Sequence, residues 1–262
     1  MDVTLNGARI HYERSGTGFP VLFIHAGIAD SRMWEPQARA WADQFDMIRP
    51  DLRGFGDSEL PPAPYSNRLD LVALLDYLGV DRAHVVGCSM GGTAAIDLAL
   101  DHPERVERLV LVAGGVSGSN LGAADAGLFA DIEAADKARD MGAVNRAEVR
   151  LWIDGPRRLE GSAPAAVRNL VLDMNGRALQ SDWASADHPG LQPPAISRLG
   201  EISTPTLVIV GDEDLPHAFA NADVITSKVS GSLRATIKDA AHLPNLERPE
   251  AFNRLVLDFL TE

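Results

Sequence analysis

Residues 85–95, "VVGCSMGGTAA", place a single serine, Ser89, between a valine-rich run and small residues that suit a helix. Glycines stand two residues before it and two residues after it, at Gly87 and Gly91. A strand that turns sharply into a helix needs such glycines, because neighbouring backbone passes too close for a Cβ. The turn lifts the serine Oγ to a helix N-terminus, where free N–H groups favour an oxyanion. The stretch therefore predicts a nucleophilic serine, and the alternative is a glycine-rich turn with an incidental serine.

The composition limits the classes of function. The chain has 262 residues, of which 45% are hydrophobic and 23% charged, with a formal net charge of −13. Such a charge repels nucleic acids and anionic lipids, so we expect no nucleic-acid or membrane partner. The one cysteine, Cys88, excludes an intrachain disulfide and a cysteine zinc cluster, and we expect it to be a small packing residue. We expect no metal and no cofactor.

The N-terminal residues lack the basic region and apolar run of a signal peptide, and no stretch has the roughly 18 apolar residues of a membrane span. These features lead us to expect a cytoplasmic protein.

Apolar runs that read as strands alternate with segments of helical spacing. An Asn6-Gly7 turn predicts a hairpin over residues 3–13. Further strands are expected at residues 21–27, 46–51, 83–87, 108–114, 206–212 and 234–242, and helices at residues 34–44, 67–78, 90–100 and 249–260. This alternation predicts an α/β fold with a mostly parallel sheet, an antiparallel N-terminal hairpin and helices on both faces.

Residues 117–203 interrupt the alternation. They contain no convincing strand and are rich in Ala, Asp and Arg at helical spacing. Because a connection between two strands rarely needs so many residues, we expect a helical cap inserted into the domain. The core would then comprise residues 1–116 and 204–262, and the cap residues 117–203.

A nucleophilic serine needs a base, for which an imidazole is the usual choice. Of the seven histidines, His242 follows the last expected strand, at the sheet edge where ligands of parallel sheets gather. His217 is the alternative base. An orienting carboxylate is expected at Asp214, three residues past the glycine that ends a strand, with Asp212 as the alternative. The other histidines are assigned to packing or the surface, although His25 ends a strand near the site: His11, His25, His84, His102 and His188.

An oxyanion needs two backbone donors. We expect one from the Met90 amide, directly after the serine, and one from the loop after "VLFIH". Gly27 is the candidate in that loop, because a residue without a side chain lets its backbone approach a substrate closely.

The chain resembles the α/β-hydrolase superfamily over almost its whole length. The segments that carry the resemblance are "FIHAGIADSRMW", "RPDLRGFGDS", "HVVGCSMGG", "HPERVERLVLVA", "PTLVIVGDEDLP" and "AAHLPNLERPEAF". It is most similar in character to the capped esterases and lactonases that include the 3-oxoadipate enol-lactonases. The resemblance implies an eight-stranded sheet, with Ser89 as nucleophile, Asp214 as acid and His242 as base. It implies the Gly27 and Met90 amides as oxyanion donors.

Two departures from family patterns bear on this assignment. Many members carry His-Gly-Gly or His-Gly-x where this chain has His25-Ala26-Gly27, which leaves Ile28 as an alternative oxyanion donor. Members that use an aspartate nucleophile are excluded by Ser89. Dienelactone hydrolases use cysteine at this position, and Cys88 stands one residue too early.

These features predict a serine hydrolase that acts on a small-molecule ester or lactone. One alternative is hydrolysis of a C–C bond in a diketone, or perhydrolysis, by the same residues. The arginines that would bind a substrate carboxylate in that case are Arg150, Arg157, Arg158 and Arg168. Another alternative is a non-catalytic protein that binds a small molecule. Pocket residues are expected among His25, Ile28, Phe129, Trp152 and Trp183, for which ordinary packing is the alternative.

Overall fold

The computed structural model describes residues 1–262 except 62, 121–124, 126, 182 and 184–185. Its centre is an eight-stranded sheet with strand order β1-β2-β4-β3-β5-β6-β7-β8. Strand β2 pairs antiparallel with β1 and with β4, and every pairing from β4 to β8 is parallel. The strands are β1 (Asp2–Leu5), β2 (Ala8–Gly16), β3 (Phe19–Ile24), β4 (Phe45–Pro50), β5 (Ala83–Cys88), β6 (Val106–Val112), β7 (Thr206–Gly211) and β8 (Leu233–Ile237). The predicted α/β class, parallel sheet and N-terminal hairpin are confirmed.

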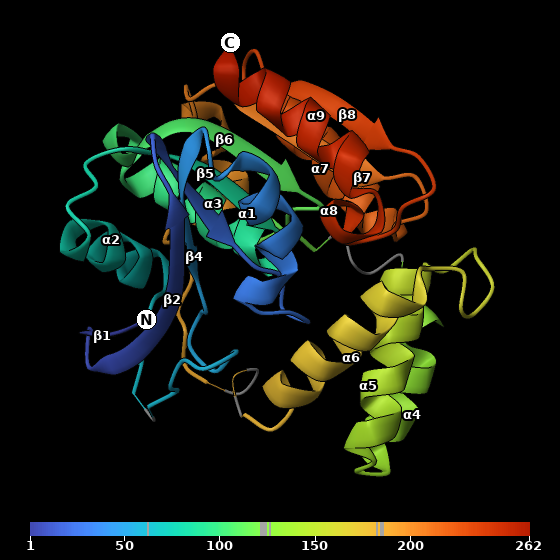
Figure 1. The fold of residues 1–262 in the computed structure, drawn as a ribbon. Coiled ribbons are helices and arrows are strands. Elements are labelled where there is room, and N and C mark those ends of the chain that lie inside the picture. Colours follow the sequence, from blue (N-terminus) through green and yellow to red (C-terminus); the bar gives the residue numbers. More distant parts are fainter. Residues whose placement is uncertain (62, 121–124, 126, 182, 184–185) are drawn as a thin grey trace.

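Helices cover both faces of the sheet (Figure 1). The core helices are α1 (Glu35–Trp41), α2 (Asn67–Tyr77), α3 (Met90–Asp101), α7 (Pro216–Lys228), α8 (Pro244–Glu247) and α9 (Pro249–Thr261). Short 3-10 helices cover Ser31–Trp34, Pro103–Arg105, Ala195–Ser197 and Leu199–Glu201. The helix expected at 34–44 is therefore a 3-10 turn followed by the shorter α1, with a proline in its first turn.

The central strands are buried on both faces, and alternate side chains enter two different cores. Leu22 and Ile24 of β3 pack with the residues of α2, α3 and α7. Val21 and Phe23 pack on the opposite face with α1 and α9. Two hydrophobic layers of this kind hold the strands in one register, so the carboxyl ends of β5, β7 and β8 lie along one edge of the sheet.

The chain between β6 and β7 contains helices but no strand among its described residues. Its helices are α4 (Ala130–Lys137), α5 (Met141–Val149), a π-helical turn (Arg150–Asp154) and α6 (Ala165–Ala178). Figure 1 shows α4, α5 and α6 grouped together, apart from the sheet. We call residues 117–203 the helical insert.

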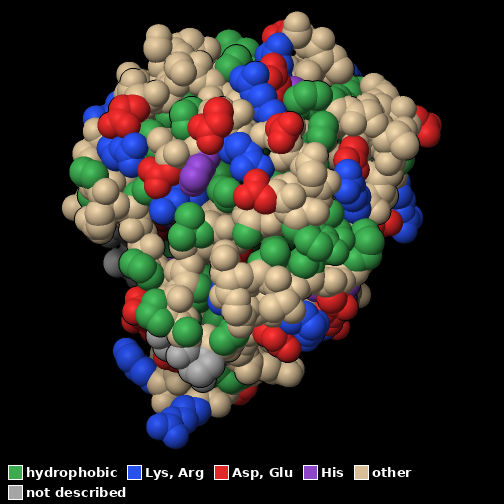
Figure 2. Space-filling view, turned by 90° about the vertical axis from the view of Figure 1, so that its left-hand side faces the viewer, with side chains coloured by type: hydrophobic (Ala, Val, Ile, Leu, Met, Phe, Trp, Pro, Cys, Tyr) green, Lys and Arg blue, Asp and Glu red, His purple; other side chains and the backbone are tan. Residues whose placement is uncertain are grey.

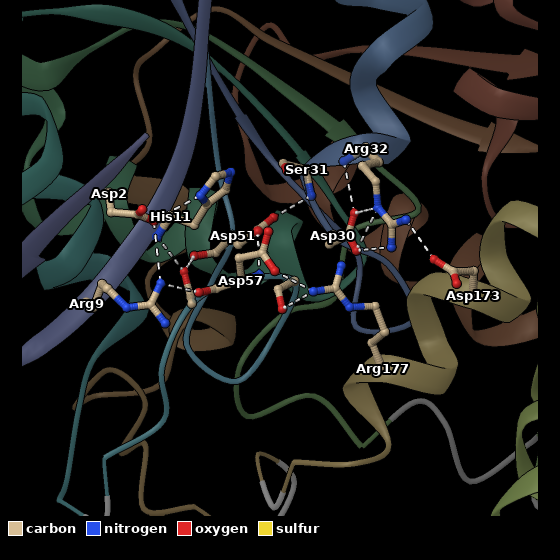
Figure 3. A network of polar contacts seen from close by, with 12 residues as sticks. Asp2, Arg9, His11, Asp30, Ser31, Arg32, Asp51, Asp57, Asp173 and Arg177 are labelled. Atoms are coloured by element: carbon tan, nitrogen blue, oxygen red, sulfur yellow. Dashed lines mark hydrogen bonds and ion pairs between the residues drawn. The ribbon is translucent and has the colours of Figure 1, made fainter.

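Charged side chains of both signs share the face drawn in Figure 2, with hydrophobic side chains between them. Ion pairs also join the insert to the core. In Figure 3, Arg32 reaches Asp173 of α6 with a 2.6 Å contact, and Arg177 of α6 contacts Asp57. The arginine belongs to the core in the first pair and to α6 in the second. Both ion pairs join α6 to the core.

Candidate active site

Ser89 occupies a strained turn between β5 and α3. Its backbone has φ 53° and ψ −112°, which is outside the regions that L-residues normally adopt. A Cβ on Gly91 would lie 2.3 Å from the carbonyl oxygen of Ile24, and a Cβ on Gly87 would lie 2.3 Å from that of Gly91. The explanation of the paired glycines as a requirement of close backbone approach is therefore confirmed. Strain of this kind costs about 1–3 kcal/mol and is typical of functional sites.

His242 and Asp214 form a buried pair at the same edge of the sheet. Nδ1 of His242 lies 2.9 Å from Oδ1 and 3.1 Å from Oδ2 of Asp214. The two side chains are only 2% and 0% exposed. Oδ1 of Asp214 also accepts a 2.7 Å hydrogen bond from the Leu215 amide, which fixes the carboxylate. When Nδ1 donates its proton to this carboxylate, Nε2 keeps the lone pair that a general base needs.

The loop that carries His242 lies beside the residue that precedes Ser89. Sγ of Cys88 is 3.8 Å from the carbonyl oxygen of His242. Burial, with the charge of Asp214 as the next cause, raises the pKa of the Cys88 thiol well above its ordinary value. Cys88 is thus a protonated packing residue that brings the loops of β5 and β8 together.

Of the two carboxylates considered for the His242 partner, the geometry selects Asp214. Asp212 instead supports the turn after β8, where its Oδ1 lies 3.4 Å from the Ala240 amide. Its own amide donates to the carbonyl of Ile237 at 3.0 Å.

His217, the alternative base, belongs to a second Asp–His pair. Its Nδ1 contacts Oδ2 of Asp125, and its backbone amide donates to the same oxygen at 3.2 Å. The Asp125 side chain is fully buried and the His217 side chain is 19% exposed. The Trp152 ring stands against both imidazoles, 4.4 Å from the His242 centroid and 5.7 Å from the His217 centroid. Sequence reasoning missed Asp125, because nothing in the helical insert marks one acid among many.

The candidate oxyanion donors lie around the turn of Ser89. Met90 is the first residue of α3, so its N–H has no acceptor within the helix. Neither Gly27 nor Ile28 has a backbone acceptor among the described residues. A Cβ on Gly27 would lie 3.8 Å from Cβ of Met90, which places the two residues side by side.

A cavity of about 530 Å³ opens beside Ser89, a volume suited to a small molecule. Its walls come from α2, α3, α7, the loop after β6 and the insert. The described lining residues are Tyr65, Ser66, Asn67, Arg68, Ser89, Met90, Thr93, Ala94, Asp97, Ala113, Gly115, Ser117, Trp183, His188, Pro189, Gly190, His217 and Asn221. Most of these side chains are polar. Thr93 and Asp97 were missed, although their spacing of four and eight residues after Ser89 puts all three on one helix face.

The expected pocket residues are distributed differently. Trp183 lines the cavity, whereas Phe129 lies with its ring 5.9 Å from that of Trp152. Ile28 is 8% exposed in the loop after β3.

The His25 ring is fully buried and has backbone partners on both sides. Nε2 of His25 accepts a 2.9 Å bond from the Leu52 amide, and Nδ1 lies 2.8 Å from the carbonyl oxygen of Ala26. Burial lowers its pKa, so His25 is a neutral ring that ties β3 to the loop after β4.

The π-helical turn of the insert is packed directly on the loop of His242. The Trp152 carbonyl accepts a 3.1 Å hydrogen bond from the His242 amide. Arg158 donates to Glu247 at 2.7 Å and to the carbonyl of Asp239 at 3.1 Å, while Glu247 accepts a 2.8 Å bond from the Ala241 amide. Burial raises the pKa of Glu247 to about 7, against the opposing effect of Arg158. π-helical turns are rare and frequently mark functional sites.

Each of the four arginines considered for a substrate carboxylate has acceptors within the protein. Arg150 donates to the carbonyls of Gly155 and Arg158, each at 2.6 Å. Arg157 contacts the Asp212 carbonyl, and Arg168 contacts the buried Asp154. Arg158 contacts Glu247. Arg150 and Arg168 therefore join parts of the insert to one another, whereas Arg157 and Arg158 join the insert to the core.

None of the described helices is long and apolar enough to cross a membrane. The described His, Cys, Asp and Glu residues form no group of three or more that is placed to hold a metal ion.

The comparisons with known proteins identify the family. The alpha/beta hydrolase fold model matches residues 20–249, and the chain belongs to this family of hydrolases. It is similar to carboxylesterase YbfK of Bacillus subtilis (strain 168), with 27% identity over 92% of this chain and 79% of that protein. It is also 28% identical to 2-hydroxy-6-oxo-6-phenylhexa-2,4-dienoate hydrolase of Burkholderia cepacia, over 98% of this chain and 92% of that one. The crystal structure of the enol-lactonase from Burkholderia xenovorans LB400 superposes with a TM-score of 0.80 at 28% identity, covering 100% of both chains. Esterases, lactonases and a C–C hydrolase are therefore among its relatives.

Proposed function

We propose that this protein is a serine hydrolase that cleaves a small carboxylic ester or lactone, with Ser89, His242 and Asp214 as its catalytic residues. The observation that carries the proposal is the buried His242–Asp214 pair, joined at 2.9 Å, at the edge of the sheet where the strained Ser89 follows β5. The similarity to a carboxylesterase and to an enol-lactonase supports the same class of substrate.

The proposed reaction proceeds through an acyl-enzyme. Nε2 of His242 takes the Ser89 proton while Oγ forms a bond to the carbonyl carbon, and Asp214 holds the imidazole in the required tautomer. The tetrahedral intermediate then breaks its C–O bond to the leaving oxygen, which receives the proton from His242. In a lactone this oxygen remains tethered to the acyl group. A water molecule, deprotonated by His242, attacks the acyl carbon, and Ser89 leaves with the proton.

The tetrahedral oxyanion would bind to the Met90 amide and to one amide of the loop after β3. Gly27 is the proposed second donor and Ile28 the alternative. The N-terminus of α3 adds the positive end of a helix dipole at the same place. Removal of one such donor typically costs about 10²–10³ in rate in other enzymes.

The helical insert, residues 117–203, is proposed to act as the cap of this site. Trp183 of the insert lines the cavity, and Trp152 packs against His242 at 4.4 Å. A cap in this position would exclude water and select substrates by shape.

Hydrolysis of a C–C bond is the second candidate, because a hydrolase of this kind is among the relatives. The arginines that would bind a substrate carboxylate are committed to protein acceptors, such as Arg158 to Glu247 at 2.7 Å. This pairing favours the ester or lactone. Turnover of a vinylogous diketone that exceeds turnover of aryl esters and lactones would reverse the order.

The test of the proposed nucleophile is covalent labelling with a fluorophosphonate, read by intact mass. Oγ of an activated Ser89 bonds to phosphorus and fluoride leaves, so the wild type should gain a single adduct. Ser89→Ala should gain none. Ser227→Ala serves as the control, because Oγ of Ser227 donates to the Val224 carbonyl of its own helix at 2.8 Å. An adduct that persists in Ser89→Ala would contradict the proposal, and tight binding of an ester without turnover would favour a non-catalytic role.

A further inference from the structure

One face of α3 connects the candidate nucleophile to a buried acid. Ser89, Thr93 and Asp97 recur every four residues, and all three line the same cavity. At a rise of about 1.5 Å per residue, Asp97 lies about 12 Å along the helix from Ser89. The cavity therefore has a reactive end at Ser89 and a distal end at Asp97.

Asp97 is poorly paired for a buried carboxyl group. It is 8% exposed, and its only hydrogen bond among the described residues is a long one, from Oγ of Ser117 to Oδ1 at 3.4 Å. The nearby arginines contact another acid, since Arg68 lies 3.2 Å and Arg198 lies 3.0 Å from the carboxylate of Asp101. Buried polar groups are normally satisfied, so an acid left in this condition inside a cavity is suited to a ligand.

A second acceptor, one without a partner among the described residues, lines the same cavity. Asn67, the first residue of α2, lines the cavity, and its buried Oδ1 has no partner among the described residues. Asp97, with one long hydrogen bond, and Asn67 Oδ1, with none, favour a ligand group that carries several N–H bonds.

The charge of the distal end depends on pH. Burial raises the pKa of Asp97 to about 6, with Asp101 acting in the same direction and Arg68, Ser117 and Arg198 acting against it. The other titratable or charged residues that line the cavity are Tyr65, Arg68, His188 and His217, and the Arg68 guanidinium contacts the carboxylate of Asp101 at 3.2 Å. Asp97 is therefore an anion above about pH 6 and a neutral acid below it.

We propose that Asp97 forms a distal subsite for a primary ammonium group, carried by the substrate about 10–12 Å from its scissile carbonyl. The inference rests on the proposed function, because it describes one end of the cavity that begins at Ser89. It narrows the substrate class from small esters and lactones in general to those with an amine at the end of an extended chain.

The test compares two p-nitrophenyl esters, one of ω-aminooctanoic acid and one of nonanoic acid, which have chains of equal length. A matched pair of acetate esters, of an ω-amino alcohol and of the equally long alkanol, covers binding through the alcohol portion. In one of the two pairs we expect kcat/KM at pH 8 to favour the amine about tenfold or more, which corresponds to one charge-assisted hydrogen bond. The preference should fall as the pH is lowered through 6, while the substrate amine remains protonated.

Asp97→Asn should reduce the preference to about one, and Asp97→Glu should retain part of it. Asp81→Asn removes one exposed surface charge and is the control, with the preference of the wild type. Equal kcat/KM for amine and alkyl substrates in both pairs, at every pH, would overturn the subsite.

Direct binding separates this inference from the proposed function. Calorimetric titration with ω-aminooctanoate should give tighter binding than nonanoate in the wild type and equal binding in Asp97→Asn. If Ser89 is not labelled and no ester is hydrolysed, the proposed function fails, while this titration still decides the subsite. If Ser89 is labelled and the wild type binds both acids equally, the subsite alone is refuted.

Discussion

Two Asp–His pairs contact the Trp152 ring through their imidazoles, and both consist of the same two chemical groups. In each pair Nδ1 of the imidazole contacts a fully buried carboxylate, Asp214 for His242 and Asp125 for His217. The pairs differ in where they are held. His242 is 2% exposed in a loop after β8, whereas His217 is 19% exposed in the first turn of α7.

The surroundings of the pairs separate their proposed roles. The His242 loop contacts Cys88, the neighbour of Ser89, and lies at the edge of the sheet. His217 faces the cavity, and its carboxylate belongs to the helical insert. An Asp–His pair by itself does not tell which of the two imidazoles is the proposed base. Its position relative to the nucleophile decides the assignment.

The largest predicted difference is in the loss of kcat when one or the other imidazole is removed. His242→Ala is expected to lower kcat for an aryl acetate by about 10⁴ or more, as removal of the base does in serine hydrolases. His217→Ala should change kcat less than about tenfold, because it removes only a contact in the cavity. Steady-state kinetics of both variants measure this directly, and similar losses in the two would remove the distinction between the pairs.

Replacement of the carboxylate should likewise lower kcat more in the His242 pair than in the His217 pair. Asp214→Asn is expected to lower kcat by about 10²–10⁴, since the amide favours the wrong tautomer of His242. Asp125→Asn should act mainly on KM, through the orientation of His217. A larger loss of kcat in Asp125→Asn than in Asp214→Asn would transfer the catalytic role to the second pair.

Trp152 touches both pairs, and its replacement should produce a smaller effect. Trp152→Ala is expected to lower kcat about 10-fold, because a ring 4.4 Å from His242 restrains the imidazole. Trp152→Ala should also shift the acidic limb of the pH–rate profile. Trp152→Phe should recover most of the lost kcat and bring this limb back toward its position in the wild type. The pH profiles of the two variants are the measurement. A profile that shifts equally in both would mean that the aromatic ring does not position His242.

The smallest effect concerns the support of the His242 loop. The pKa of Glu247 is raised to about 7 in the folded protein, above its ordinary 4.5. The folded state then binds more protons than the unfolded state between these values, so Glu247 contributes stability below pH 4.5 that is lost as the pH rises through 7. The loss should be at most about 3 kcal/mol.

Urea denaturation of the wild type and of Glu247→Gln, at pH 5 and pH 8, measures this contribution. The wild type should lose more stability than the variant between the two pH values. A pH dependence that is identical in both proteins would show that Glu247 does not titrate in this range.

The sequence indicated the fold and the residues at the strand ends because these follow from local patterns. The glycines around Ser89 mark a turn that tolerates no Cβ, and Asp214 and His242 each follow an apolar strand by a few residues. Strand direction then brings all three to one edge of the sheet without further information.

The remaining parts of the site depend on tertiary contacts that no local pattern specifies. Asp125 lies in an acid-rich insert, so its pairing with His217 is visible only in the folded chain. The π-helical turn at Arg150–Asp154 has no sequence signal of its own. His25 follows the end of β3 near the site, but Nε2 of its ring accepts a 2.9 Å hydrogen bond from the Leu52 amide. Asp97 was predictable in principle, since its spacing from Ser89 is two helical turns.

The most direct test of the central claim, that His242 and not His217 activates Ser89, is the rate at which a fluorophosphonate labels Ser89. The wild type, His242→Gln and His217→Gln would be compared at pH 8, with the adduct located by peptide mapping. We expect labelling to slow by about 10³ or more in His242→Gln and by less than about threefold in His217→Gln. Labelling that is unaffected in His242→Gln, or lost in His217→Gln, would contradict the account.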